Sequence, residues 1–288
     1  MNVRSRSNLG LSFAILLIVS AFATNSVITR FMVTNDLAQA FPLTVVQFLS
    51  GFIMLLVIGL AFPRSFSRSS FGKNNLLGGL LLASYGLAIS FGYLFISAAV
   101  GTLIFYASVV LTMSIYSVIV DRERLIKKEI GGLIISVIGI FVLTLGGDSS
   151  VTIIGVTLMM VTGVSWGAYS VYGRRFTSSF GYTFYSFAIL LVIIVPAQLL
   201  LNPRTLLDIP LSVNGLGLAL FFGMISTALS YVLWHKALTK IKASQGGVFQ
   251  MFVPIIAAAM GITLLAEDVT ISLILGGAMI LVGIYLNS

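Results

Sequence analysis

Long apolar runs, separated by short polar breaks, are the dominant pattern of this chain. Its 16 basic and 8 acidic residues make only 24 charged positions in 288, and the 47 residues from Asn74 to Val120 carry no charge. A helix needs about 20 residues to cross a hydrocarbon core of about 30 Å. We therefore predict ten transmembrane helices, at residues 9–31, 40–62, 76–97, 102–120, 129–147, 152–173, 182–201, 214–235, 245–265 and 270–287.

The composition agrees with this pattern. The chain is 58% hydrophobic and 8% charged, with a mean hydropathy of +1.11, whereas a globular domain is about a quarter charged. Lipid must therefore be the solvent for most of the surface. The runs are too long and too uniform for the alternating strands of a membrane barrel. The expected fold class is an all-α polytopic membrane protein with ten transmembrane helices.

Basic residues gather on one side of the predicted membrane. Ten spans place 14 of the 16 basic residues on the side of the N-terminus, and leave Arg30 and Arg204 on the other. This asymmetry follows the positive-inside rule and predicts that both termini are cytoplasmic. The net charge of +8 is then explained by membrane topology, so we expect no nucleic-acid partner. The most charged stretch, VDRERLIKKE (120–129), becomes the cytoplasmic loop between the fourth and fifth helices.

The chain matches itself at an offset of 144 residues. SAFATNSVITR (20–30) aligns with VSWGAYSVYGR (164–174), and the same offset pairs Glu123 with Glu267 and Gly139 with Gly283. Arg4, Arg6 and the segment Ala21-Phe22-Ala23 also fit a cleavable signal peptide, but that cleavage site falls inside the repeated motif. We therefore predict that the first helix belongs to the fold.

Each half holds five predicted helices, in residues 1–144 and 145–288. Because five is odd, the second unit enters the membrane from the opposite side, which gives inverted repeats (5+5). This design is typical of secondary transporters, whose substrate site lies between the units near the midplane. The pattern predicts alternating access around such a site.

Several motifs resemble a known family. The segment 231–286 carries a Pro before a Glu-ended turn and then a Gly-bearing helix, with Pro254, Glu267, Gly276 and Gly283. The segment VTGVSWGAYSVYGR (161–174) resembles the start of a second unit of the same kind. The chain is similar to EamA-type transporters of the drug/metabolite transporter superfamily over nearly its whole length.

This resemblance implies a secondary carrier, most often an exporter of amino acids, metabolites or drugs, in the plasma (inner) membrane of a bacterium. The first unit departs from the family pattern at three positions. Phe22 stands where the family commonly has Trp, Gln47 where it has Arg, and Val110 where it has Pro. The resemblance therefore names no solute.

The predicted spans hold no deeply placed charge. Neutral, zwitterionic or cationic aromatic solutes fit such an interior best, because aromatic faces and carbonyl groups accept them. Helical spacing places the polar and aromatic side chains of several helices on shared faces, among them Thr227 with Tyr231 and Trp234. The candidate substrate-binding residues are Asn25, Tyr106, Trp166, Tyr169, Tyr231, Trp234 and Gln250. Pro254 is a candidate for a helix bend or gate, and His235 for ion coupling.

Structural interpretations compete with these roles. Trp234 near a helix end is typical of an interfacial anchor, and Asn25 or Gln250 can simply hydrogen-bond across helices. His235 beside Lys236 is typical of a solvated histidine at headgroup level.

Two further sets of residues have an expected structural role. Glu123 and Glu267 each end a span just before the next helix, where a carboxylate interacts favourably with a helix N-terminus. The pairs Gly131–Gly132 and Gly276–Gly277, with Gly139 and Gly283, are expected to allow close helix contact.

Other function classes are less well supported. A channel or lipid scramblase could share this composition and stays open as an alternative to a carrier. An enzyme would need paired carboxylates, a histidine cluster or an activated nucleophile, but the chain has one His, no Cys and eight acids in all. We expect no metal or other cofactor. The expected partners are a small-molecule substrate and the lipid bilayer, and the sequence leaves open a homodimer.

Overall fold

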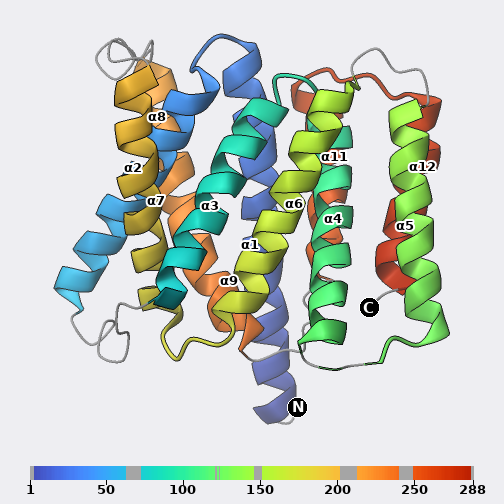
Figure 1. Ribbon diagram of the computed structural model, residues 1–288, viewed down its shortest axis with the longest axis horizontal. Coiled ribbons are helices and arrows are strands. Elements are labelled where there is room, and N and C mark those ends of the chain that lie inside the picture. The colour runs from blue at the N-terminus through green and yellow to red at the C-terminus, as the bar shows by residue number, and fades with distance from the viewer. Residues whose placement is uncertain are drawn as a thin grey trace.

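The computed structural model describes residues 3–62, 73–120, 122, 124–145, 151–201, 213–239 and 249–286, and the side chains of these except at 3–13, 73–74 and 213–215. The regular structure of these residues is helical (Figure 1). The elements are α1 (Val3–Thr34), α2 (Ala40–Ala61), α3 (Lys73–Gly92), α4 (Ala98–Ile119), α5 (Lys127–Leu145), α6 (Ile153–Gly173), α7 (Ser179–Leu201), α8 (Val213–Phe221), the π-helical segment η3 (Phe222–Leu229), α9 (Ser230–Leu238), α11 (Phe252–Leu264) and α12 (Ile271–Leu286).

The predicted spans fit these elements closely. Eight stretches of the described chain are long and apolar enough to cross a membrane, and the eighth, Leu216–Leu238, combines α8, η3 and α9. The two shorter apolar helices α11 and α12 occupy the positions of the last two predicted spans. The all-helical membrane fold predicted from the apolar runs is therefore confirmed.

The helices run up and down between two ends of the bundle. Figure 1 shows the N-terminus at the lower end and α12 descending towards the same end. We call this end the termini side and the opposite end the far side. The far side holds the α1–α2, α3–α4 and α11–α12 connections.

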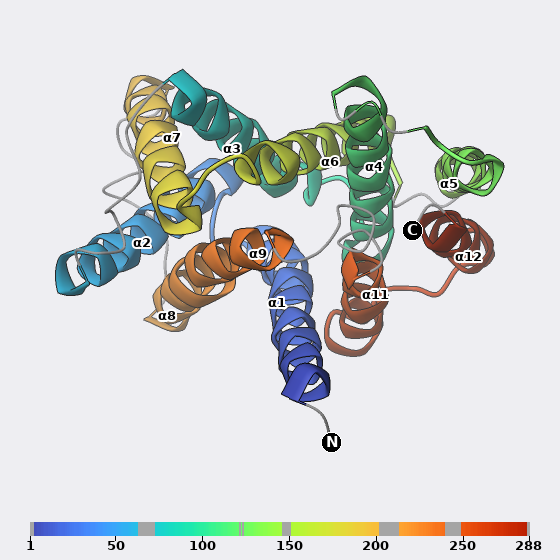
Figure 2. The ribbon, with the colours of Figure 1, turned by 90° about the horizontal axis from the view of Figure 1, so that it is seen from below.

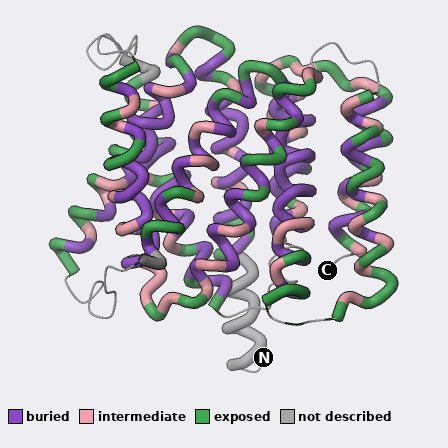
Figure 3. The backbone as a smooth tube through the Cα atoms, in the orientation of Figure 1, coloured by how far each residue is buried: buried purple, intermediate pink, exposed green. Residues whose placement is uncertain are grey.

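Burial divides the helices into central and peripheral ones. In the most apolar stretch of α4, 83% of the residues are buried, compared with 28% in α5. Figure 3 shows this contrast along the bundle, and the exposed residues of α5 include Ile134, Ile138 and Phe141. Apolar side chains on an outer surface of this kind require a lipid environment. The chain is an integral multi-pass membrane protein.

Glycines bring α5 and α12 into close contact at one edge of the bundle (Figure 2). A Cβ atom at Gly139 would lie 2.8 Å from the carbonyl oxygen of Gly276, and one at Gly283 would meet the Gly132 carbonyl oxygen and Ser136. The expected role in close helix packing is confirmed for Gly139, Gly276 and Gly283, whereas it is wrong for Gly131, because nothing lies within 4 Å of a Cβ atom there.

Two local features interrupt the helices. The segment η3 is π-helical, whereas a continuous α-helix was predicted over residues 214–235. The last but one helix is interrupted by a turn at Met251, and Pro254 lies in the first turn of the following α11. A proline ring excludes the carbonyl group four residues earlier, here that of Gln250. The helix break therefore coincides with the position of Pro254, and a role of this residue as a bend or gate stays a prediction.

The substitution Gly139→Ala is expected to destabilise the fold. The added methyl group meets the backbone of α12, so the two helices must separate, at a cost of roughly 1–3 kcal/mol. Thermal unfolding of the purified protein in detergent measures the effect. Gly131→Ala is the matched control because nothing lies within 4 Å of a Cβ atom at that position. Equal midpoints for both variants would contradict the proposed packing.

Candidate functional site

An aromatic cluster lies in the interior, where α1, α3, α6 and α9 meet. We define it by its buried residues Phe22, Tyr85, Trp166, Tyr169, Tyr231 and Trp234. Tyr231 lies at its centre, with its ring centroid 4.5 Å from that of Trp166 and 5.9 Å from that of Phe22. Phe22 also contacts Trp166 at 5.3 Å and Trp234 at 5.8 Å, both edge to face. Edge-to-face geometry is the favoured arrangement of aromatic pairs.

A short chain of polar side chains lies beside this cluster. The Gln47 amide of α2 donates to the Thr227 hydroxyl at 2.9 Å, and that hydroxyl donates to Asn25 Oδ1 of α1 at 3.5 Å. All three side chains are buried. Thr227 belongs to η3, and the neighbouring Ser226 hydroxyl donates to the Ala21 carbonyl of α1. The wider turn of η3 thus directs consecutive hydroxyl groups at α1, and π-helical turns are frequent at functional sites.

Several buried polar atoms of the predicted site have no hydrogen-bond partner among the described residues. They are Trp166 Nε1, both imidazole nitrogens of His235 and both amide atoms of Gln250. The Tyr231 and Tyr85 hydroxyls interact, but without the geometry of a well-formed hydrogen bond. An unpaired buried polar group costs about 1–3 kcal/mol. These unpaired donors and acceptors inside the bundle are therefore available to bind a ligand or water.

His235 lies inside the bundle, in contrast to the interpretation of a solvated headgroup-level residue, which is wrong. Its side chain is fully buried, with Tyr169 and Tyr182 edge-on to the imidazole at 4.8 and 5.1 Å between ring centroids. The C-terminal turn of α9 reaches this depth because Gly173 of α6 leaves room: a Cβ atom there would collide with the imidazole. Lys236, the next residue, is exposed.

Trp234 is likewise buried, so its interpretation as an interfacial anchor is wrong. Its indole Nε1 donates to Ser170 Oγ at 3.4 Å, and its ring packs on Phe22. Thr227, Tyr231 and Trp234 all contact α1, as their predicted common face requires.

The other two predicted residues, Tyr106 and Gln250, are also buried. The ring of Tyr106 of α4 is tilted against that of its neighbour Phe105, with 4.3 Å between centroids, and Phe105 contacts Tyr85 at 6.0 Å. Gln250 is buried just before the break at Met251. Asn25 does hydrogen-bond across helices, as its structural interpretation predicts.

Glu267 contacts a different helix from the one expected. Its carboxylate accepts from the backbone N–H groups of Ala98 and Ala99, which begin α4, and not from the adjacent α12. The expected structural role at a helix N-terminus is correct, but the partner is distant in sequence. Glu123 lies outside the described residues.

Tyr85 and Tyr182 are the members of this interior that the sequence did not single out. Tyr85 stands in the apolar run LLLASYGLAIS (80–90), where a lone tyrosine in mid-span is a usable signal. Tyr182 stacks on Tyr169 at 4.9 Å, and its hydroxyl donates to the Tyr169 carbonyl oxygen. It begins its span, and there a tyrosine is typical of an interfacial anchor.

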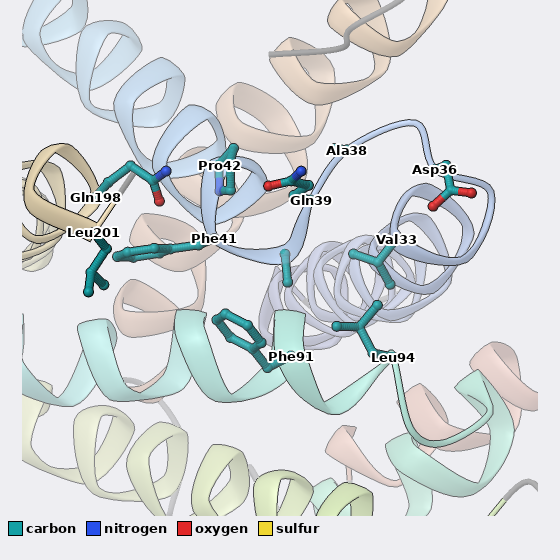
Figure 4. Close-up of a pocket in the computed structure, with 11 residues that line it drawn as sticks. Val33, Asp36, Ala38, Gln39, Phe41, Pro42, Phe91, Leu94, Gln198 and Leu201 are labelled. Atoms are coloured by element: carbon teal, nitrogen blue, oxygen red, sulfur yellow. The ribbon is translucent and has the colours of Figure 1, made fainter. Parts of the chain in front are cut away.

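A separate cavity of about 400 Å³ lies near the far side, between the ends of α1, α3 and α7 and the start of α2 (Figure 4). Its walls are mainly apolar and include Phe41 and Phe91, with Gln198 and Asp36 towards opposite ends. Its described lining residues include none of the predicted site residues.

Comparisons with known proteins agree on the class. The pattern of the EamA-like transporter family matches residues 153–288. An uncharacterized protein of Pseudomonas aeruginosa, PA1977, is 29% identical over 86% of this chain and 83% of its own. A protein of Escherichia coli K12 named "probable amino-acid metabolite efflux pump" is 25% identical over 83% of this chain and 84% of its own. A crystal structure with 19% identity has the same fold, with a TM-score of 0.65 over 96% of both chains.

The fold and these similarities define a membrane transporter. Residues 153–288 match the EamA-like transporter family, and relatives that align with most of the chain are named as transporters or efflux pumps, which confirms the resemblance carried by its motifs.

The hydroxyl of Thr227 is expected to stabilise the fold. Thr227→Val removes it and takes away the hydroxyl partner of Gln47 Nε2 and Asn25 Oδ1, at a cost of about 1–3 kcal/mol. Thr227→Ser keeps the hydroxyl and is expected to lose less. Thermal unfolding in detergent compares the two variants with the parent chain. A valine variant as stable as the serine variant would show that the polar chain contributes nothing.

Proposed function

We propose that this protein is a secondary transporter that moves a small organic solute across the membrane by alternating access, with export as its physiological direction. The observation that carries the proposal is the buried aromatic cluster with unpaired hydrogen-bonding groups beside it. Binding sites for small organic molecules combine apolar and aromatic walls with a few polar groups that fix orientation. The E. coli relative is named for efflux of amino-acid metabolites, which supports the proposed direction and solute class.

The solute is proposed to contact Asn25, Tyr106, Trp166, Tyr169, Tyr231, Trp234 and Gln250. These side chains offer aromatic faces, amide groups and hydroxyls but no formal charge, so a neutral, zwitterionic or aromatic cationic molecule suits them. Pro254 serves as the bend at which α11 can tilt, and the helix break at Met251 supports this role. His235 is the candidate for coupling to protons, because it is the single histidine of the chain and its imidazole lies beside Tyr169 of the cluster.

The two halves, residues 1–144 and 145–288, are proposed to be inverted repeats that rock around this site. Local geometry repeats at the offset of 144 residues. Arg122 and Ala266 both adopt left-handed backbone, with φ of 55° and 52°. The helices that follow them begin at Lys127 and Ile271, again 144 residues apart. These coincidences support the duplication.

The proposed orientation places the termini side in the cytoplasm of a bacterium, with the chain in the inner membrane. The charge asymmetry of the loops supports this orientation. Impermeant labelling of a C-terminal tag before and after permeabilisation of cells tests it.

Counterflow in proteoliposomes tests the function itself. Vesicles preloaded with neutral and aromatic amino acids or small organic cations are tested with and without an imposed pH gradient. Saturable exchange of one solute class is the expected result. Flux that neither saturates nor shows counterflow would instead indicate a channel or a scramblase. Acceleration by the gradient that disappears in His235→Gln would support the coupling role.

Alanine substitutions test the site. Trp166→Ala, Tyr169→Ala and Gln250→Ala are each expected to reduce transport by about tenfold, equivalent to about 1.4 kcal/mol of lost binding, at unchanged membrane expression. Phe141→Ala is the matched control, because that ring is 59% exposed on α5 and away from the cluster. Normal transport in all three site variants would remove the proposed site.

A further inference from the structure

A charged junction closes the far side of the bundle. The Glu267 carboxylate receives the N–H groups of Ala98 at 2.5 Å and Ala99 at 3.0 Å, at the first turn of α4. Its Oε1 lies 3.9 Å from Nε of Arg30. Arg30 Nη1 in turn donates to the Tyr93 carbonyl oxygen at the end of α3. We call this set the far-side strap.

The strap joins segments that are distant in the chain. Glu267 lies in the α11–α12 connection, Arg30 near the end of α1, and Ala98 at the start of α4. In the Arg30–Glu267 ion pair the two side chains are 22% and 8% exposed. Charge-assisted hydrogen bonds at a helix N-terminus are about twice as strong as neutral ones. The contact of Glu267 with Arg30 and α4 is therefore strong enough to stabilise the arrangement in which α1, α4 and the α11–α12 connection are held together.

The backbone conformation around Ala266 directs the Glu267 carboxylate towards the N-terminus of α4. Ala266 adopts left-handed φ of 52°, and the Glu267 N–H donates back to the Gly261 carbonyl oxygen. Gly261 of α11 also has to lack a side chain, because a Cβ atom there would collide with the Glu267 carboxylate. A methyl group at this position would displace the carboxylate without changing its charge.

The strap stands directly above the aromatic cluster. Phe22, Ser26 and Arg30 lie four residues apart on one face of α1, so Arg30 is about 12 Å from the level of Phe22. Ser26 is 1% exposed and lies between them. A solute in the cluster must pass this level to reach the far side.

We propose that the far-side strap is a gate: Glu267 and Arg30 hold the far side closed, and their contact with α4 parts each time the aromatic cluster opens to that side. Glu267 is thus a positioning residue that sets the equilibrium between the two open states, and it does not bind solute. The proposal rests on the alternating access put forward above.

The absence of cysteine from the chain permits a direct test. Ser26→Cys introduces a single thiol below the strap, and its rate of labelling by a charged methanethiosulfonate reagent is measured on purified protein in lipid nanodiscs. Glu267→Gln weakens the strap by removing the charge of the carboxylate. Gly261→Ala weakens it by displacing the carboxylate while its charge is kept. Each is expected to raise the labelling rate about tenfold, a shift of about 1.4 kcal/mol in the opening equilibrium.

Two matched controls accompany these variants. Glu129→Gln removes a carboxylate that accepts the Ile126 N–H at the start of its own helix, on the termini side. Gly131→Ala adds a methyl group where nothing lies within 4 Å. Both are expected to leave the labelling rate within about twofold of the parent, well below a tenfold change. A second reporter, Ser136→Cys in the α5–α12 contact, detects general loosening of the fold.

Unchanged labelling at Ser26→Cys in both strap variants overturns the gate, and so does an equal rise at Ser136→Cys. The assay needs no transported solute, so its result is separate from that of counterflow. If the protein shows solute counterflow but the strap variants do not change the labelling rate of Ser26→Cys, the gate is wrong and the proposed transport function stands. If the strap variants label faster but no solute shows counterflow, the gate is supported and the proposed transport function is not.

Discussion

The hydrogen-bonding requirement of polar groups in a bundle surrounded by lipid is the constraint on which this structure depends. Lipid offers no partners, so each buried donor or acceptor must be paired within the protein or with a ligand. Most hydroxyl groups meet this requirement locally, as Thr29 does with the Asn25 carbonyl oxygen. Thr227 meets it by bridging Gln47 and Asn25 through the π-helical segment η3. Among the groups left unpaired in the described part of the chain are Trp166 Nε1 of α6, the imidazole nitrogens of His235 of α9 and the amide of Gln250 just before α11.

This distribution connects fold and transport. A cluster of six aromatic side chains packs through its rings, and its faces can exchange one aromatic or cationic partner for another. Charge is kept at the two ends of the bundle. On the far side it forms the contact between Glu267, Arg30 and α4. An uncharged interior below a charged closure is an arrangement that can open without exposing an unpaired ion to lipid.

The sequence predicted the fold well and the site in part. Runs of about 20 apolar residues define spans almost directly, because the bilayer allows little else. Small residues on facing helices also indicated the close contact of α5 and α12 at Gly139, Gly276 and Gly283, although not at Gly131. The burial of Trp234 and His235 was not predicted, because a position near a helix end does not reveal which face of the helix turns inwards. For His235, the space left by Gly173 allows the imidazole to lie inside the bundle. The π-helix depends on tertiary contacts with α1 and α2, so hydrophobic periodicity could not indicate it. Glu267 reaches α4 through a contact between residues 169 positions apart.

Intrinsic fluorescence gives the most direct test of the central claim that solute binds in the aromatic cluster. The chain contains two tryptophans, Trp166 and Trp234, and both lie in the cluster, fully or almost fully buried. Titration of the purified protein with the solute identified by counterflow should change the tryptophan emission saturably, and Trp166→Phe should remove most of that change. Saturable transport with tryptophan emission that never responds would contradict the account.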